Sequence, residues 1–212
     1  MNINSQFGFY AVLTDPLVGY EEMTRILVDH NIAFVQLRMK DAPLDLIRRT
    51  AEKMRCITLG SSTKFIVNDS PEIAIEVSAD GVHIGQDDYP VEDVRAMIKP
   101  GMIIGLSTHS PSQTTDACMR CPDYIGVGPV YATPTKKNPD PVIGLDGMKK
   151  QLDAASVPAV VIGGIDFSNL RDVLSAGAKN FCMVRQLTKS DKPSEVLDKV
   201  KKIYNEYYPG FY

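Results

Sequence analysis

An amide and two basic side chains stand at alternating positions in Gln36-Leu37-Arg38-Met39-Lys40. If this segment is a β-strand, Gln36, Arg38 and Lys40 project from one face, because side chains alternate along a strand. A guanidinium and an ammonium on one wall are suited to bind phosphate or pyrophosphate. A solvated sheet edge is the other interpretation, and the alternation by itself does not separate the two.

Carboxylates follow the next two apolar runs, in Asn68-Asp69 and in His83-Ile84-Gly85-Gln86-Asp87-Asp88. Mg²⁺ prefers oxygen ligands and is commonly held by one or two carboxylates together with substrate phosphates. Asp69 and Asp88 are therefore candidates to share one ion. Helix capping is the alternative, because the residues that follow, Ser70-Pro71 and Pro90, are typical of helix starts.

Polar groups also follow the next two runs. Ser107 and His109 come after the fifth run, where a hydroxyl either binds an anion or starts the helix before Pro111. The longest interruption, residues 128–141, contains two threonines and two lysines beside prolines. Loops of this length are usually functional or disordered, and this composition favours a lid that closes over phosphate.

The last two runs end in Gly163-Gly164 and in Val184-Arg185. Glycines at this point let the backbone approach a ligand closely, and a tight turn would use them equally well. In (β/α)₈ barrels, the loops after strands seven and eight frequently hold phosphate. These segments are a second candidate anion site.

The elements that must position these residues alternate along the chain. Eight short apolar runs have strand length, namely Phe9–Leu13, Ala33–Leu37, Lys64–Val67, Gly81–Ile84, Met102–Leu106, Tyr124–Val127, Ala159–Ile162 and Asn180–Val184. Segments with helical spacing lie between them, as in Met23, Ile26 and Leu27. Continuous apolar runs are typical of parallel strands buried on both faces. The pattern predicts an α/β protein, a single (β/α)₈ TIM barrel over residues 1–212, with its site at the carboxyl ends of the strands.

Composition limits the partners. Of the 212 residues, 44% are hydrophobic and 23% charged, and the net charge is −3, which is typical of a globular protein. No run of Lys or Arg is long enough to follow a nucleic-acid backbone, and no apolar stretch is long enough to span a membrane. We expect a cytoplasmic protein with small-molecule substrates, no nucleic-acid or membrane partner, and possible homo-oligomers.

Taken in order, the strand-end segments resemble the thiamine phosphate synthase family, and the resemblance spans nearly the whole chain. It includes Gly105-Leu106-Ser107, Gly128-Pro129 and Thr133-Pro134-Thr135-Lys136 in addition to the segments above. The resemblance implies a transferase of thiamine biosynthesis that condenses hydroxymethylpyrimidine diphosphate with hydroxyethylthiazole phosphate, or with its carboxylated precursor. It also implies Mg²⁺ as the cofactor and pyrophosphate as the second product.

The resemblance further implies residue roles. Gln36, Arg38, Lys40, Asn68, Ser107 and Lys136 would hold the pyrimidine diphosphate, and we expect Arg38, Ser107 and Lys136 to act in catalysis. Asp69 and Asp88 would bind the metal. Thr133, Thr135, Gly164 and the backbone of Val184 and Arg185 would hold the thiazole phosphate.

One departure and two alternatives accompany this interpretation. The family usually has a small residue where this chain has Arg185, so the phosphate pocket after strand eight is altered. A thiazole tautomerase on the same barrel is one alternative, for which His109 would be the functional residue. A barrel that binds a phosphate ligand without turnover is the other.

Overall fold

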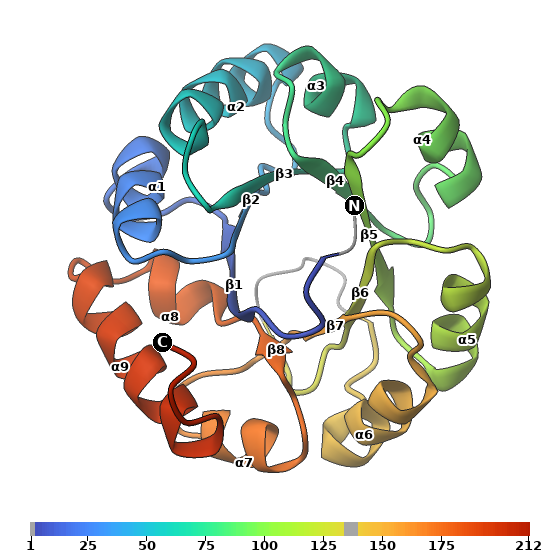
Figure 1. Ribbon diagram of the computed structural model, residues 1–212, viewed down its shortest axis with the longest axis vertical. Helices are drawn as coiled ribbons and strands as arrows, with labels where there is room; N and C mark the ends of the chain where they lie inside the picture. Colours follow the sequence, from blue (N-terminus) through green and yellow to red (C-terminus); the bar gives the residue numbers. More distant parts are fainter. Residues whose placement is uncertain (1–2, 134–139) are drawn as a thin grey trace.

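The computed structural model describes residues 3–133 and 140–212. In it, eight parallel strands close into a barrel in chain order, from β1 to β8. Figure 1 shows this barrel along its axis. The strands are β1 (Gly8–Leu13), β2 (Phe34–Leu37), β3 (Lys64–Asn68), β4 (Gly81–Ile84), β5 (Ile103–Thr108), β6 (Tyr124–Val127), β7 (Ala159–Val161) and β8 (Asn180–Phe181).

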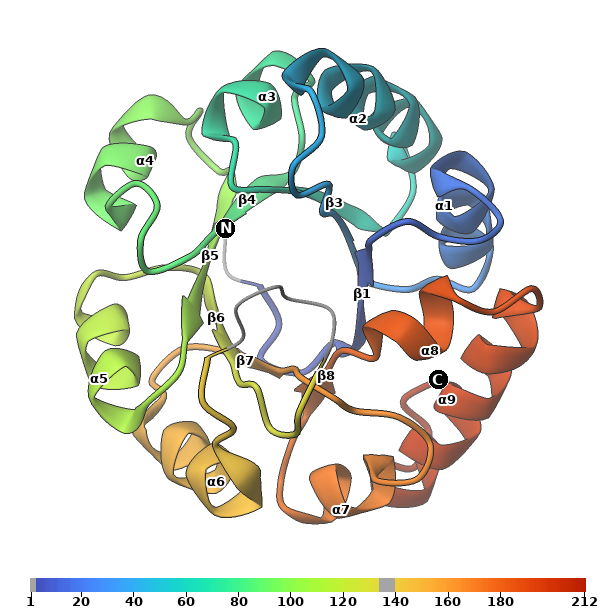
Figure 2. The ribbon, with the colours of Figure 1, turned by 180° about the vertical axis from the view of Figure 1, so that it is seen from behind.

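Helices surround the strands, as Figures 1 and 2 show from the two ends of the barrel. They are α1 (Tyr20–Asp29), α2 (Leu44–Thr58), α3 (Pro71–Glu76), α4 (Val91–Met97), α5 (Pro111–Met119), α6 (Gly144–Ala154), α7 (Leu170–Ser175), α8 (Val184–Thr188) and α9 (Pro193–Tyr207). No helix in the described ranges combines the length and the apolar character needed to cross a bilayer.

The predicted (β/α)₈ barrel is confirmed, and its cause is visible in the burial of the strands. All residues of β1, β2 and β6 are buried, because one strand face meets the barrel interior and the other meets the helices. Some predicted strand ends differ from the structure. Ser107 lies within β5, which is longer than predicted. Val184 begins α8 and is not part of β8, because β8 pairs with each of its two neighbours over only two residues.

Aromatic rings fill the amino-terminal half of the barrel interior. The ring centroids of Phe7 and Phe34 are 4.6 Å apart, and the ring of Tyr10 stacks on Phe34 at 5.4 Å. Tyr124 is also in this cluster and is 1% exposed. These side chains close one end of the barrel, so that open space is left at the other end.

The aromatic C-terminal segment packs on the outside of the same barrel. Tyr204 lies 5.9 Å from the ring of Phe181 in β8, and the hydroxyl of Tyr212 accepts a 2.7 Å hydrogen bond from the amide of Phe9 in β1. This segment therefore covers the join between the first and last strands.

Candidate active site

A cavity of about 740 Å³ lies above the aromatic rings, at the carboxyl ends of the strands. Most of the residues predicted from the sequence line it, namely Gln36, Arg38, Lys40, Asn68, Asp69, Asp88, Ser107, Thr133, Gly164, Val184 and Arg185. Two predicted residues, Thr135 and Lys136, lie outside the described residues. Segments distant in sequence therefore meet at one opening, as the barrel topology requires.

The basic wall belongs to β2 and the residues that follow it. Gln36 is 4% exposed, and both Arg38 and Lys40 reach the cavity, so the interpretation as a solvated edge is wrong. Burial lowers the pKa of Arg38, and the nearby Asp69 and Asp41 oppose that shift. Lys40 forms an ion pair with Asp69. The wall thus carries two cations beside a carboxylate.

Asp69 and Asp88 come from consecutive strand ends and lie together. The alternative that they cap helices is wrong, because the N-cap residues of α3 and α4 are Ser70 and Pro90, and neither helix has a side-chain cap. Asp88 instead accepts a 2.6 Å hydrogen bond from the amide of Gly85. The turn after β4 holds its carboxylate over the cavity.

The environment of Asp88 raises its pKa, mainly through burial and further through the charge and hydrogen bond of Asp69. Two adjacent carboxylates disfavour each other's ionisation, and a dication removes that repulsion. The oxygen pair fits Mg²⁺, whose remaining ligands are usually water and phosphate. Among the described residues, no group of three or more His, Cys, Asp or Glu side chains forms a complete protein cage.

Ser107 is held by two neighbours. Its backbone carbonyl accepts a 2.6 Å hydrogen bond from the amide of Gln86, and its hydroxyl lies 3.0 Å from Nε2 of His83. His83 also contacts the hydroxyl of Tyr124 through Nδ1, at 3.0 Å. Tyr10, His83 and Tyr124 also line the cavity, although none of them was predicted as a site residue, because each lies inside an apolar strand run where a core side chain is expected.

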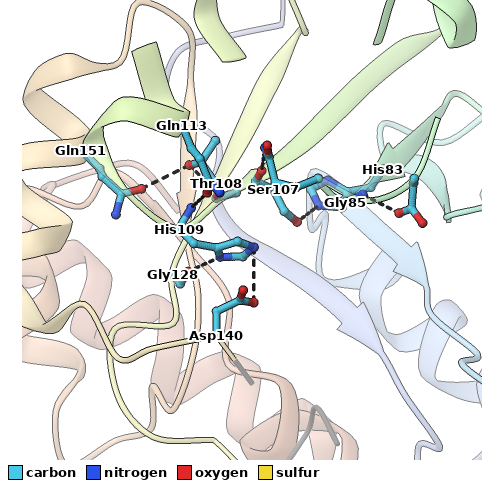
Figure 3. Close-up of polar contacts among 12 residues, drawn as sticks. His83, Gly85, Ser107, Thr108, His109, Gln113, Gly128, Asp140 and Gln151 are labelled. Carbon is cyan, nitrogen blue, oxygen red and sulfur yellow. Dashed lines mark hydrogen bonds and ion pairs between the residues drawn. The ribbon is translucent and has the colours of Figure 1, made fainter. Parts of the chain in front are cut away.

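His109 has both ring nitrogens occupied. Nδ1 donates to the carbonyl of Gly128 at 2.6 Å, and Nε2 lies 3.3 Å from a carboxylate oxygen of Asp140. Figure 3 shows the imidazole between these two groups. The ring connects β5 to two points of the β6–α6 connection, which is a positioning role for the loops.

The glycines after β7 allow two loops to pack closely. A Cβ on Gly163 would lie 2.4 Å from Cα of Pro129, and one on Gly164 would lie 2.5 Å from the carbonyl oxygen of Ala132. Both glycines have positive φ, at +106° and +61°, where other residues are strained. Arg185, in the first turn of α8, is exposed at the rim of the cavity.

Comparison with known proteins gives consistent results. The family model "Thiamine monophosphate synthase" matches residues 10–187. The thiamine-phosphate synthase of Dictyoglomus turgidum is 35% identical over 191 residues, which are 90% of this chain and 86% of the relative. That of Gloeobacter violaceus is 42% identical over 171 residues, or 79% of this chain, and this match spans half of the relative's length.

Solved structures give the same fold. The thiamine phosphate pyrophosphorylase of Pyrococcus furiosus superposes with a TM-score of 0.85 at 28% identity, over 95% of this chain and 96% of that one. A 3-hexulose-6-phosphate synthase of Salmonella typhimurium has a TM-score of 0.68 at 13% identity, over 94% and 99%. The second similarity concerns the barrel fold alone.

Proposed function

The chain belongs to the thiamine monophosphate synthase family, and from this premise we propose that its barrel mouth joins hydroxymethylpyrimidine diphosphate to a thiazole phosphate. The products are thiamine phosphate and pyrophosphate. The observation that carries the proposal is the meeting of Arg38, Lys40, Asp69 and Asp88 at one cavity opening. This arrangement provides cations for a diphosphate and a carboxylate pair for a metal.

The reaction makes one bond and breaks one. The bond between the pyrimidine methylene carbon and the diphosphate oxygen breaks, and the diphosphate leaves with the electron pair. The aminopyrimidine ring delocalises the positive charge left on that carbon. The thiazole nitrogen then donates its lone pair to form the carbon–nitrogen bond.

The protein groups act on charge and on water. Arg38 and Lys40 stabilise the negative charge that develops on the departing diphosphate, and preorganised cations at a half-buried site do so effectively. Asn68 and Ser107 orient the pyrimidine diphosphate, and Thr133 lies at the opening where the thiazole phosphate would bind. The buried barrel interior excludes water from the reactive carbon. No protein nucleophile is needed.

Asp69 and Asp88 are the residues that would hold Mg²⁺. The chemistry that Mg²⁺ supplies when bound is neutralisation of charge on the diphosphate oxygens. Support for this assignment is the donor set itself, a pair of adjacent carboxyl groups with room for phosphate beside it. The cytoplasmic location and any homo-oligomer stay predictions.

Thiazole isomerisation is the second candidate, because His109 lines the same cavity. An acid–base role needs a ring nitrogen that can reach the substrate. Both nitrogens of His109 are engaged by Gly128 and Asp140, and the paired carboxylates have no part in an isomerisation. The condensation accounts for more of the site.

The direct test mixes the pure protein with both half-substrates and Mg²⁺ and measures thiamine phosphate by chromatography. Product that depends on all three additions supports the proposal. Isomerised thiazole phosphate without metal would support the second candidate, and binding of both substrates without any product would support a non-catalytic barrel.

A further inference from the structure

A continuous chain of hydrogen bonds crosses the floor of the cavity. Nε2 of Gln36 donates to the hydroxyl of Tyr10 at 3.0 Å, and that hydroxyl lies 2.7 Å from the hydroxyl of Tyr124. Tyr124 lies 3.0 Å from Nδ1 of His83, and Nε2 of His83 lies 3.0 Å from Oγ of Ser107. We name Tyr10, Tyr124 and His83 the relay. It joins the wall at β2 to the wall at β5.

The strand register explains how the relay forms. His83, Gly105 and Tyr124 are aligned across β4, β5 and β6. A Cβ on Gly105 would lie 2.1 Å from Cζ of Tyr124 and 2.4 Å from Nδ1 of His83. Because Gly105 has no side chain, the two rings lean toward each other across β5 and make contact.

Space filling does not account for these hydroxyls. A phenylalanine would occupy nearly the same volume as Tyr10 or Tyr124 among the neighbouring aromatic rings, and burying a hydroxyl is unfavourable unless it is hydrogen-bonded. Burial raises the pKa of both tyrosines far above the usual range. Each phenol therefore keeps its single hydrogen and can donate to only one neighbour.

Counting hydrogens gives the relay a direction. The amide nitrogen of Gln36 donates to Tyr10. The order that gives every hydroxyl hydrogen an acceptor within the relay has Tyr10 donating to Tyr124 and Tyr124 donating to Nδ1 of His83. A neutral imidazole then carries its hydrogen on Nε2 and donates it to Ser107. Ser107 keeps its own hydrogen for an acceptor in the cavity, while Gln36 keeps its amide oxygen for a donor.

The two ends are coupled. If the amide of Gln36 turned over, every bond in the relay would reverse, with Gln36 accepting from Tyr10 and Ser107 donating to His83. Toward the cavity, Ser107 would then offer an acceptor and Gln36 a donor. One end therefore always offers a donor when the other offers an acceptor. A ring nitrogen next to an exocyclic amino group presents the matching pair.

We propose that Tyr10, Tyr124 and His83 are positioning residues that keep Gln36 and Ser107 complementary to an aminopyrimidine ring, and so select the pyrimidine substrate by its amino group. This inference rests on the proposed function. It assigns a specificity role to two buried tyrosines and a partly buried histidine at the floor of the cavity.

The test compares two probes by calorimetry: the aminopyrimidine diphosphate, and the same compound with hydrogen in place of the amino group. The wild type should bind the amino probe at least tenfold more tightly. Tyr124→Phe removes the central hydroxyl and keeps the ring, so this preference should fall about tenfold, which corresponds to one hydrogen bond. The KM for the aminopyrimidine diphosphate should rise similarly, with the KM for thiazole phosphate unchanged within about twofold.

Tyr204→Phe is the matched control. Tyr204 is 0% exposed, and its hydroxyl makes two hydrogen bonds, to Gln6 and to the carbonyl of Lys179, outside the cavity. The probe preference should be unchanged in this variant. If Tyr124→Phe does not fold, Tyr10→Phe is the second variant, because it interrupts the relay nearer Gln36. It should lower the preference for the amino probe by a similar factor.

If the relay variants bound both probes more weakly by the same factor, the role of the relay would be purely structural and the proposal would be overturned. An unchanged preference for the amino probe would overturn it as well. Product formation by the wild type is measured in parallel. Absence of thiamine phosphate would refute the proposed reaction, whereas the calorimetric preference still decides the role of the relay.

Discussion

The amide of Gly85 donates a 2.6 Å hydrogen bond to Asp88, three residues further along the chain, and turns that carboxylate toward Asp69. Asp87, its neighbour in sequence, is exposed as Asp88 is, but only Asp88 is among the described residues that line the cavity. Two adjacent aspartates thus have different surroundings, although their side chains are identical.

Replacement of Asp88 should therefore be far more damaging than replacement of Asp87. Asp88→Ala should lower kcat on the order of 100-fold or more, because charge on the leaving diphosphate would lose its stabilisation. Asp87→Ala should stay within about threefold. Rates of thiamine phosphate formation against Mg²⁺ concentration test this, and equal losses would remove Asp88 from the metal site.

Arg38 is half-buried, and we expect its geometry to matter in addition to its charge. Arg38→Ala should reduce kcat/KM on the order of 100-fold, and Arg38→Lys about tenfold, because an ammonium cannot make the paired contacts of a guanidinium. Steady-state kinetics measure both. Arg49→Ala is the control, since Arg49 pairs with Asp45 on the exposed surface of α2. Full activity of Arg38→Ala would contradict the diphosphate site.

His109 separates the two candidate reactions. If its function is to connect β5 with the β6–α6 connection, His109→Ala should lower thiamine phosphate formation by less than about tenfold, which is at most the loss of one hydrogen-bonded link. A general acid–base residue would cost about 100-fold or more. Assays of condensation and of thiazole isomerisation on the same variant distinguish these outcomes.

Gly163 should be intolerant of a side chain. Gly163→Ala places a methyl group against Pro129 and should lower the free energy of unfolding by about 2–4 kcal/mol, through overpacking and positive φ together. Gly177 has a similar φ of +101° with nothing within 4 Å of an added Cβ. Gly177→Ala should cost only about 1–2 kcal/mol. Urea denaturation measures both, and equal costs would mean that packing against Pro129 is unimportant.

Stability should fall at high pH. Burial raises the pKa of Tyr204 from 10.0 to about 12, so the folded state keeps a proton that the unfolded state releases. The stabilisation is fully present below pH 10 and is lost as the pH rises from 10 to about 12. Between these two pH values, Tyr204 adds a slope of about 1.4 kcal/mol per pH unit to the decline of the unfolding free energy. Tyr204→Phe should make the decline of unfolding free energy less steep, and an unchanged slope would contradict this.

The fold and much of the site were predictable because both depend on local patterns. Apolar runs of strand length, separated by helical spacing, are specific to parallel strands with helical crossovers. Alternation along β2 placed Gln36, Arg38 and Lys40 on one wall, and strand ends placed Asp69 and Asp88 at one rim. The choice between capping and the cavity for these carboxylates was open in the sequence, because a helix start and a strand end occupy the same few residues.

Tyr10 and Tyr124 could not be found in this way, since each lies inside an apolar run where an aromatic residue is ordinary core. They are 114 positions apart, yet their hydroxyls are 2.7 Å apart. The strands, the helices and the polar residues at the strand ends could be predicted from the sequence alone, because they follow from local periodicity. Only closure of the barrel decided which buried polar groups meet, because it brings β1, β4 and β6 around one interior in which every hydroxyl needs a partner.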